Sequence, residues 1–190
     1  ISVSLLLVVA LAAGFVAWRH QQLESRLSTV ASALVGSPVE VHCQTWGQSM
    51  ADVSAHLGYV KWGPDGVPER ETLIKRGVCG DLRGFLNNPD AALTRDRIVA
   101  VHILSHESMH MAGEKSEATT ECQALQRNAI LARLLGATPA TAEQLAVRYW
   151  TDLYPNQSAD YRSGDCRPGG GLDERLPDAP WNLSLNGPGA

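Results

Sequence analysis

The most continuous hydrophobic pattern lies at the start of the chain. Residues 1–18, ISVSLLLVVALAAGFVAW, are almost uninterrupted in apolar character and carry no charge. A membrane-spanning helix needs about 20 apolar residues, and Trp18, Arg19 and His20 resemble an interfacial flank. We therefore expect a transmembrane anchor over residues 1–18. A cleaved signal segment is the alternative, because the small residues at 10–12 fit a cleavage site.

Shorter patterns with a helical or an alternating period follow the apolar run. Residues 19–36 carry apolar side chains at helical spacing, which predicts a helical linker that ends at Ser37-Pro38. Residues 39–46, VEVHCQTW, alternate and are rich in β-formers, so they predict a strand. Residues 51–58 predict a short helix. Residues 59–74 predict a hairpin, because a Pro-Asp-Gly turn separates two extended stretches.

The strongest helical pattern covers residues 94–113. Thr94 is a suitable N-cap, and Gly113 is a suitable residue to end the helix. A second helix is predicted over residues 116–137, with Ser116 as its N-cap.

A third helix is predicted over residues 138–154, with Pro139 near its start. Residues 155–190 are rich in Pro, Gly and Asn and are predicted to be irregular. Together these patterns predict a mainly helical α+β protein, in which residues 37–154 form one domain around a small β region.

Composition and charge narrow the function classes. The chain has 190 residues and a net charge of −4, which argues against nucleic acid as a partner, since that usually requires a basic surface. Arg19 and Arg26 after the apolar run favour a cytoplasmic domain. The cysteines argue the other way, because an even, widely spaced set without a CxxC pair indicates disulfides outside the cell. We expect an extracytoplasmic domain, and of the three pairings that four cysteines allow we predict Cys43–Cys79 and Cys122–Cys166.

The segment SHESMHMAGEKSEATTEC, residues 105–122, carries the candidate chemistry. His106 and His110 are four residues apart on the predicted helix, so both rings can reach one metal ion. Glu107 projects about 100° away around the helix, where it could hold a water without ligating the metal. This is the HExxH arrangement of zinc peptidases.

A catalytic zinc ion requires a third protein ligand and one open position. Gly113 allows the chain to turn back, which places Glu117 in the first turn of the next helix as the candidate third ligand. Glu121, one turn further on, is predicted to accept a hydrogen bond from a ligand histidine and fix its tautomer.

The remaining histidines are assigned no role at the metal. His102 extends the histidine stripe by one turn, but three helical histidines span about 12 Å, too far for one ion. We expect His102 to be packed or partly exposed, and His42 and His56 to be ordinary surface residues.

Residues 101–126, VHILSHESMHMAGEKSEATTECQALQ, resemble the active-site core of zincin metallopeptidases with a glutamate ligand. The resemblance implies a zincin-like fold in which His106, His110 and Glu117 bind zinc, Glu107 is the general base and Glu121 supports a ligand. The interval before Glu117 is shorter than in that branch. This interval and Gly113 look more like the HExxHxxG type of zincin. In that type the third ligand would fall at Ser116, and serine is a poor zinc ligand. The same string and the later YRSGDCRPGG are also similar to a set of exported actinobacterial proteins.

The sequence therefore predicts a membrane-anchored, extracytoplasmic zinc metallohydrolase, and the expected reaction is hydrolysis of peptide bonds. The substrate is expected to add as a strand to a sheet edge, either 39–46 or 57–62. Tyr161 and Arg162 are candidate donors to the oxyanion. Two alternatives remain open at this stage: an inactive cell-envelope interaction module, with or without zinc, and a metal-dependent hydrolase of cell-wall material.

Overall fold

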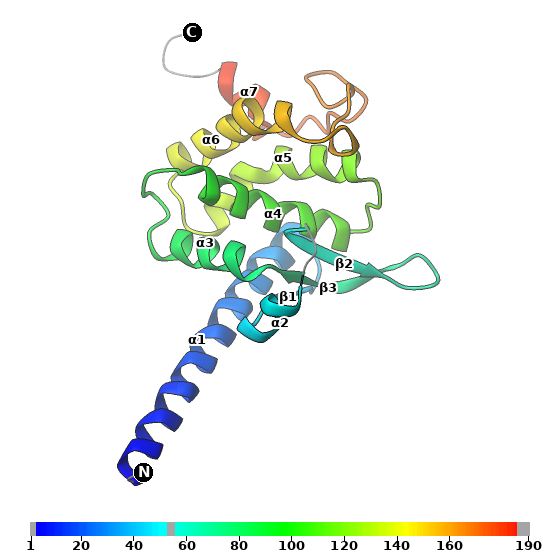
Figure 1. The fold of residues 1–190 in the computed structure, drawn as a ribbon. Helices are drawn as coiled ribbons and strands as arrows, with labels where there is room; N and C mark the ends of the chain where they lie inside the picture. The colour runs from blue at the N-terminus through cyan, green and yellow to red at the C-terminus, as the bar shows by residue number, and fades with distance from the viewer. Residues whose placement is uncertain (1–2, 53–55, 186–190) are drawn as a thin grey trace.

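A computed structural model describes residues 3–52 and 56–185 and shows a mainly helical α+β fold with a small sheet (Figure 1). Its helices are α1 (Val3–Val35), α2 (Trp46–Ala51), α3 (Arg76–Asn87), α4 (Arg95–Met111), α5 (Glu117–Leu134), α6 (Pro139–Arg148) and α7 (Pro180–Leu185). Its strands are β1 (Glu40–Cys43), β2 (Gly58–Trp62) and β3 (Pro68–Ile74). A π-helical turn at Tyr149–Leu153 follows α6, and short 3₁₀ turns follow at Tyr154–Asn156 and Ala159–Tyr161.

Helix α1 is one continuous helix with two different environments. Its N-terminal half projects away from the rest of the fold, and apolar side chains such as Leu11 and Phe15 are exposed there (Figure 1). Its C-terminal half, predicted as a linker, instead buries Leu23, Leu27 and Ala31 in the core at a spacing of four residues. Within residues 3–52 and 56–185, no helix has the length and apolar character to cross a membrane, so the predicted anchor is not supported.

The sheet has the strand order β1-β3-β2, with β1 parallel to β3 and β2 antiparallel to it. The predicted hairpin is confirmed as β2 and β3, and the predicted strand at 39–46 as β1. The outer edge of β1 is covered by α1. Alternate backbone N–H groups, those of Val39, Val41 and Cys43, donate to a row of α1 side chains. The acceptors are Ser32 Oγ at 3.0 Å, Ser28 Oγ at 2.9 Å and Glu24 Oε1 at 2.7 Å. Strands β1 and β2 are the two edge strands of the sheet, and α1 covers the free edge of β1.

Two elements differ from the prediction. The short helix lies at Trp46–Ala51 and not at 51–58, because Thr45 and Gln48 form a capping box that starts it earlier. Residues 53–55 of the predicted helix lie outside the described residues. Helix α3 was not predicted, since Gly77, Gly80 and Gly84 interrupt its helical pattern.

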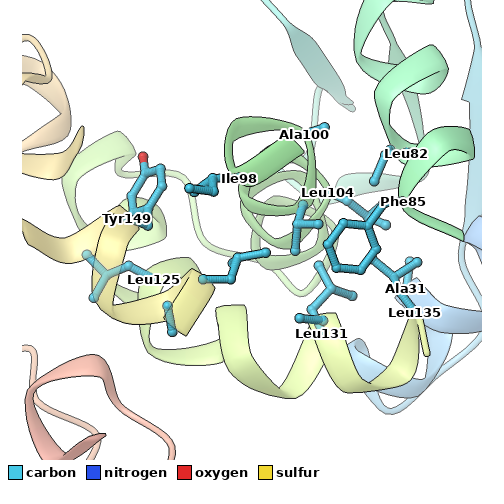
Figure 2. Close-up of a cluster of buried hydrophobic side chains, with 14 of the residues drawn as sticks. Ala31, Leu82, Phe85, Ile98, Ala100, Leu104, Leu125, Leu131, Leu135 and Tyr149 are labelled. Carbon is cyan, nitrogen blue, oxygen red and sulfur yellow. The ribbon is translucent and has the colours of Figure 1, made fainter. Parts of the chain in front are cut away.

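The core surrounds α4 and makes it the central helix of the fold. Figure 2 shows Phe85 of α3, Leu104 of α4 and Leu131 of α5 directed toward one another, with Ala31 of α1 beside them. Most side chains of α4 from Ile98 onward are buried. Polar side chains on this helix are therefore held by packing on several sides.

Two disulfides tie the periphery to this core, in the predicted pairing. Cys43–Cys79 links the end of β1 to α3, and Cys122–Cys166 links α5 to the C-terminal segment. That segment is largely irregular, as predicted, apart from its 3₁₀ turns and α7. The disulfide holds the chain around Tyr161 near α5, which carries two of the candidate site residues.

Candidate metal centre

The turn between α4 and α5 brings the two halves of the candidate site together. Thr94 caps the start of α4 by accepting a hydrogen bond from the Arg97 N–H, as predicted. Gly113 adopts a φ of 116°, a conformation that favours glycine, and reverses the chain. Ser116 then caps α5, so Glu117 occupies its first turn. These local signals fold residues 106 and 110 against residues 117 and 121.

The ligand atoms of the three predicted metal ligands lie close together. His106 Nε2 lies 3.0 Å from both His110 Nε2 and Glu117 Oε2, and His110 Nε2 lies 3.4 Å from the same carboxylate oxygen. Zinc ligands at 2.0–2.2 Å in a tetrahedral arrangement are separated by about 3.3–3.5 Å. The observed separations are close to that value, so the donor types and their spacing fit a tetrahedral divalent ion. His106, His110 and Glu117 could therefore hold a metal.

Burial and charge differ among the three ligands. Both histidines are buried, whereas the Glu117 side chain is 42% exposed, so the group has one side open toward solvent. Hydrogen bonds from His106 and His110 lower the pKa of Glu117 to about 2. Burial lowers the pKa of His106, but its hydrogen bonds to Glu117 and Glu121 outweigh burial and raise this pKa to about 9. Glu117 is thus an anionic ligand at neutral pH.

Glu121 lies behind His106 and fixes its orientation. Its Oε2 is 3.1 Å from His106 Nδ1 and 2.9 Å from His102 Nε2, while its Oε1 accepts a hydrogen bond from the Tyr149 hydroxyl. Burial raises the pKa of Glu121, but His102 and His106 hold it well below its ordinary value. With its Nδ1–H donating to this carboxylate, His106 directs Nε2 toward His110 and Glu117, and a metal ion bound there would displace the Nε2 proton.

His110 is oriented in the same manner by a different acceptor. Its Nδ1 lies 2.7 Å from the carbonyl oxygen of Glu114, in the turn that Gly113 allows. An Nδ1–H that donates to this carbonyl leaves the Nε2 lone pair free for a metal. Both histidines therefore point the same ring nitrogen at the same position.

Glu107 lies apart from the three ligands, as the HExxH pattern predicts. It is buried against the sheet, with its Oε2 3.5 Å from Thr72 Oγ1 on β3. A Cβ atom at Gly58 of β2 would lie 2.8 Å from Glu107 Oε1, so a larger residue here would displace the Glu107 side chain. Burial raises the pKa of Glu107, against the opposing effect of His106 and His110. A carboxylate with a raised pKa is suited to accept and return a proton near neutral pH.

A cavity of about 440 Å³ opens beside His106 and Glu107 and runs along α4. Such a volume lies within the usual range for ligand pockets, about 300–1,000 Å³. Its lining residues come from four segments of the fold: His56, Leu57, Gly58, Arg95, Val99, His102, Ile103, His106, Glu107, Tyr149, Gln157 and Tyr161.

The two candidate oxyanion donors are separated by the structure. Tyr161 lines the cavity, and its ring centroid lies 5.7 Å from that of His106. Burial, followed by the nearby Glu117, raises the pKa of Tyr161, which keeps its hydroxyl protonated as a donor. Arg162 instead donates to the Pro155 carbonyl and lines a different hollow. Of the two, only Tyr161 is placed beside the candidate ligands.

Several residues near the site were not predicted from the sequence. His102 is packed, one of the two environments expected for it: it is buried and stacks on Tyr149 with ring centroids 3.6 Å apart. Its contacts with Glu121 at 2.9 Å and Asn128 at 3.1 Å were not predicted. His56, predicted as a surface residue, is exposed but lines the cavity. The one sequence signal for His102 was its place four residues before His106 on the same helical face.

Within the described part of the chain, two other groups of histidine and glutamate also lie close enough to hold an ion. One joins His102, His106 and Glu121 and is entirely buried. The other joins Glu40, His42 and Glu71 on the outer face of the sheet and is largely exposed. His42, expected to be a surface residue, thus lies between two carboxylates, at 3.4 Å and 3.7 Å.

Comparisons with protein-family models, curated proteins and solved structures found no match to this chain.

Proposed function

We propose that this protein is a zincin-like, zinc-dependent hydrolase that cleaves peptide bonds outside the cytoplasm. The proposal rests above all on the convergence of His106 Nε2, His110 Nε2 and Glu117 Oε2, with Glu107 left out of that set. A purely structural zinc ion is usually enclosed by four protein ligands. A three-ligand group that is open on one side, beside a buried carboxylate and a cavity, favours catalysis instead. The two disulfides indicate an oxidising, extracytoplasmic environment.

The chemistry is divided among groups with separate positions. Zinc, when bound, would polarise the scissile carbonyl and lower the pKa of water. The Glu107 carboxylate would take the proton of the attacking water and pass it to the leaving amine nitrogen. The Tyr161 hydroxyl would donate a hydrogen bond to the developing oxyanion. Glu121 and the Glu114 carbonyl would keep the two histidines in the required tautomer.

The sheet supports a peptide as the substrate class. An extended peptide can bind by adding a strand to an open sheet edge. The edge at β1 is covered by α1, which favours 57–62 over 39–46 as the substrate edge. In the described part of the chain, β2 pairs with β3 alone, and its residue Gly58 contacts Glu107. A peptide added along β2 would therefore pass directly beside the candidate general base.

The deciding experiment compares Glu107→Gln with Glu117→Gln. The zinc content of the purified chain and its cleavage of a mixed peptide library are measured for both variants and the wild type. Glu107→Gln should retain zinc but lose about 10²–10⁴-fold in rate, because the general base is lost. Glu117→Gln should lose zinc affinity, since a neutral amide replaces a charged ligand. Glu143→Gln, on an exposed part of α6, is the matched control and should change neither property.

Two outcomes would contradict the proposal. If Glu107→Gln loses zinc as readily as Glu117→Gln, Glu107 is a ligand and not the base. If the wild type holds zinc and cleaves no peptide in the library, an interaction module becomes the better account of the fold.

A further inference from the structure

The cavity beside the candidate metal centre is lined by a cationic residue and by apolar residues that have no role in the proposed hydrolysis. Its metal end carries Glu107, and the neighbouring Glu117 adds a second negative charge. Its far end carries Arg95, in the first turn of α4. Arg95 is exposed, and no hydrogen bond or ion pair to its side chain occurs among residues 3–52 and 56–185. The cavity thus runs from the candidate metal centre and Glu107 to a cation that has no hydrogen-bond or ion-pair partner in the described part of the chain.

One side of the wall between these ends is apolar, while His102, Tyr149 and Gln157 line other parts of it. Val99 and Ile103 line the cavity at positions four and eight residues after Arg95, which places them on the same face of α4. Leu57, just before β2, lines it as well. His56 is a second group at the cavity that can donate a hydrogen bond to an anion. A cavity with an apolar side and a cationic end is complementary to an apolar chain that carries a negative charge.

We propose that this cavity binds the part of the substrate beyond the scissile bond, and that Arg95 selects a carboxylate there. The proposal rests on the peptidase function proposed above and adds its substrate class: peptides with apolar side chains and a nearby carboxylate. Guanidinium groups bind carboxylates through paired, charge-assisted hydrogen bonds. Among the described residues that line the cavity, Arg95 is the one guanidinium group, so it fixes the end of the cavity at which the carboxylate lies.

The dimensions indicate where that carboxylate lies. Arg95 and His106 are eleven residues apart on α4, which corresponds to about 16 Å along the helix axis. An extended peptide advances about 3.3–3.6 Å per residue, and the arginine side chain itself covers several ångströms of the interval. The carboxylate should therefore lie about two to four residues from the scissile bond. It can belong to the chain terminus or to an Asp or Glu side chain.

The experiment uses the zinc-loaded full chain and a set of apolar peptides in three forms. One form has a free C-terminus, the second is amidated, and the third is amidated with Glu placed two, three or four residues from the cleaved bond on either side. The variants are Arg95→Ala and the matched control Arg83→Ala, an α3 arginine that lines a different hollow.

Wild type should cleave carboxylate-bearing peptides about 10- to 100-fold better than neutral ones, measured as kcat/KM. Arg95→Ala should lose this preference, with kcat/KM for carboxylate-bearing peptides falling to the value for neutral peptides, while Arg83→Ala should keep the preference.

The outcomes separate this proposal from the hydrolytic one. Preference for the free C-terminus alone assigns the carboxylate to the chain end, and preference for Glu assigns it to a side chain. An unchanged preference in Arg95→Ala overturns the role of Arg95. If the wild type cleaves nothing, binding of the same peptides to zinc-loaded Glu107→Gln is measured by calorimetry. A carboxylate preference there that disappears in the double variant with Arg95→Ala supports the cavity assignment without the enzyme. Equal binding of all three forms contradicts it.

Discussion

The two groups of possible ligands that share His106 have the same kinds of side chain but different surroundings. On one side, His106 Nε2 meets His110 and Glu117, whose side chain is 42% exposed. On the other side, His106 Nδ1 meets His102 and Glu121, which are each only 2% exposed. Their interatomic distances are similar, 3.0–3.4 Å against 2.9–3.1 Å. Distance alone therefore does not distinguish a metal site from a hydrogen-bond network.

The neighbours of each group provide the distinction. In the buried group every atom already has a complementary partner, because Tyr149 donates to Glu121 and Asn128 contacts His102. A buried carboxylate with three donors around it is satisfied without an ion. The open group brings two imidazole Nε2 atoms and an anionic carboxylate to one point, where a metal ion that displaces the Nε2 proton of His106 would satisfy all three. We infer that the metal belongs on the open side and that the buried side supports it.

The largest expected effect comes from the shared residue. His106→Ala removes a ligand from the open group and an Nδ1 donor from the buried one. Zinc binding at micromolar metal should be abolished, because two remaining ligands rarely hold a catalytic zinc ion. Titration with a metal-sensitive dye measures this directly, with His42→Ala on the outer face of the sheet as control. Full zinc occupancy in His106→Ala would place the metal elsewhere.

Glu121→Gln should have an intermediate effect on both metal binding and folding. The substitution removes the charge that His102 and His106 share, and it puts an amide where three donors converge. Loss of such a supporting carboxylate typically lowers metal affinity about 10- to 100-fold. The unpaired buried donors should also lower the free energy of unfolding by about 1–3 kcal/mol. Denaturant melts with and without zinc separate the two effects. A variant that retains full zinc affinity would show that His106 needs no support from Glu121.

His102→Phe should have the smallest effect on the metal. Phenylalanine preserves the stacking on Tyr149 but removes the contacts with Glu121 and Asn128. We expect a loss of about 1–2 kcal/mol in unfolding free energy and less than about a tenfold change in zinc affinity. The same dye titration tests this. Complete loss of zinc in a folded His102→Phe protein would reverse the comparison and make the buried group the metal site.

The sequence was most informative where the signal is local. The caps at Thr94 and Ser116, the turn at Gly113 and the HESMH spacing predicted α4, α5 and the approach of Glu117. Each of these depends on residues within one or two turns of each other, so the pattern can be read directly. Both disulfides were also predicted, because four cysteines allow few pairings.

The surroundings of the site depended on long-range packing and were missed. The contacts of His102 with Glu121 and Asn128 join positions 19 and 26 residues apart. Tyr149 reaches Glu121 from a π-helical turn, which no propensity rule predicts. Gly58 gave no sign that its missing side chain makes room for Glu107. In each case a side chain acquires its role only after separate elements pack together.

The covering of β1 by α1 also affects which fragments of the chain can remain monomeric. Ser28, Ser32 and Glu24 act in place of a fourth strand, since they accept hydrogen bonds that a neighbouring strand would otherwise accept. A fragment that begins after Glu24 would lose the acceptor of the Cys43 N–H and the buried Leu23. Unprotected edges associate with edges of other copies and lead to aggregation. The C-terminal half of α1 therefore prevents the β1 edge from pairing with the sheet of another copy. Shortened versions of the protein should retain this helix from about His20 onward.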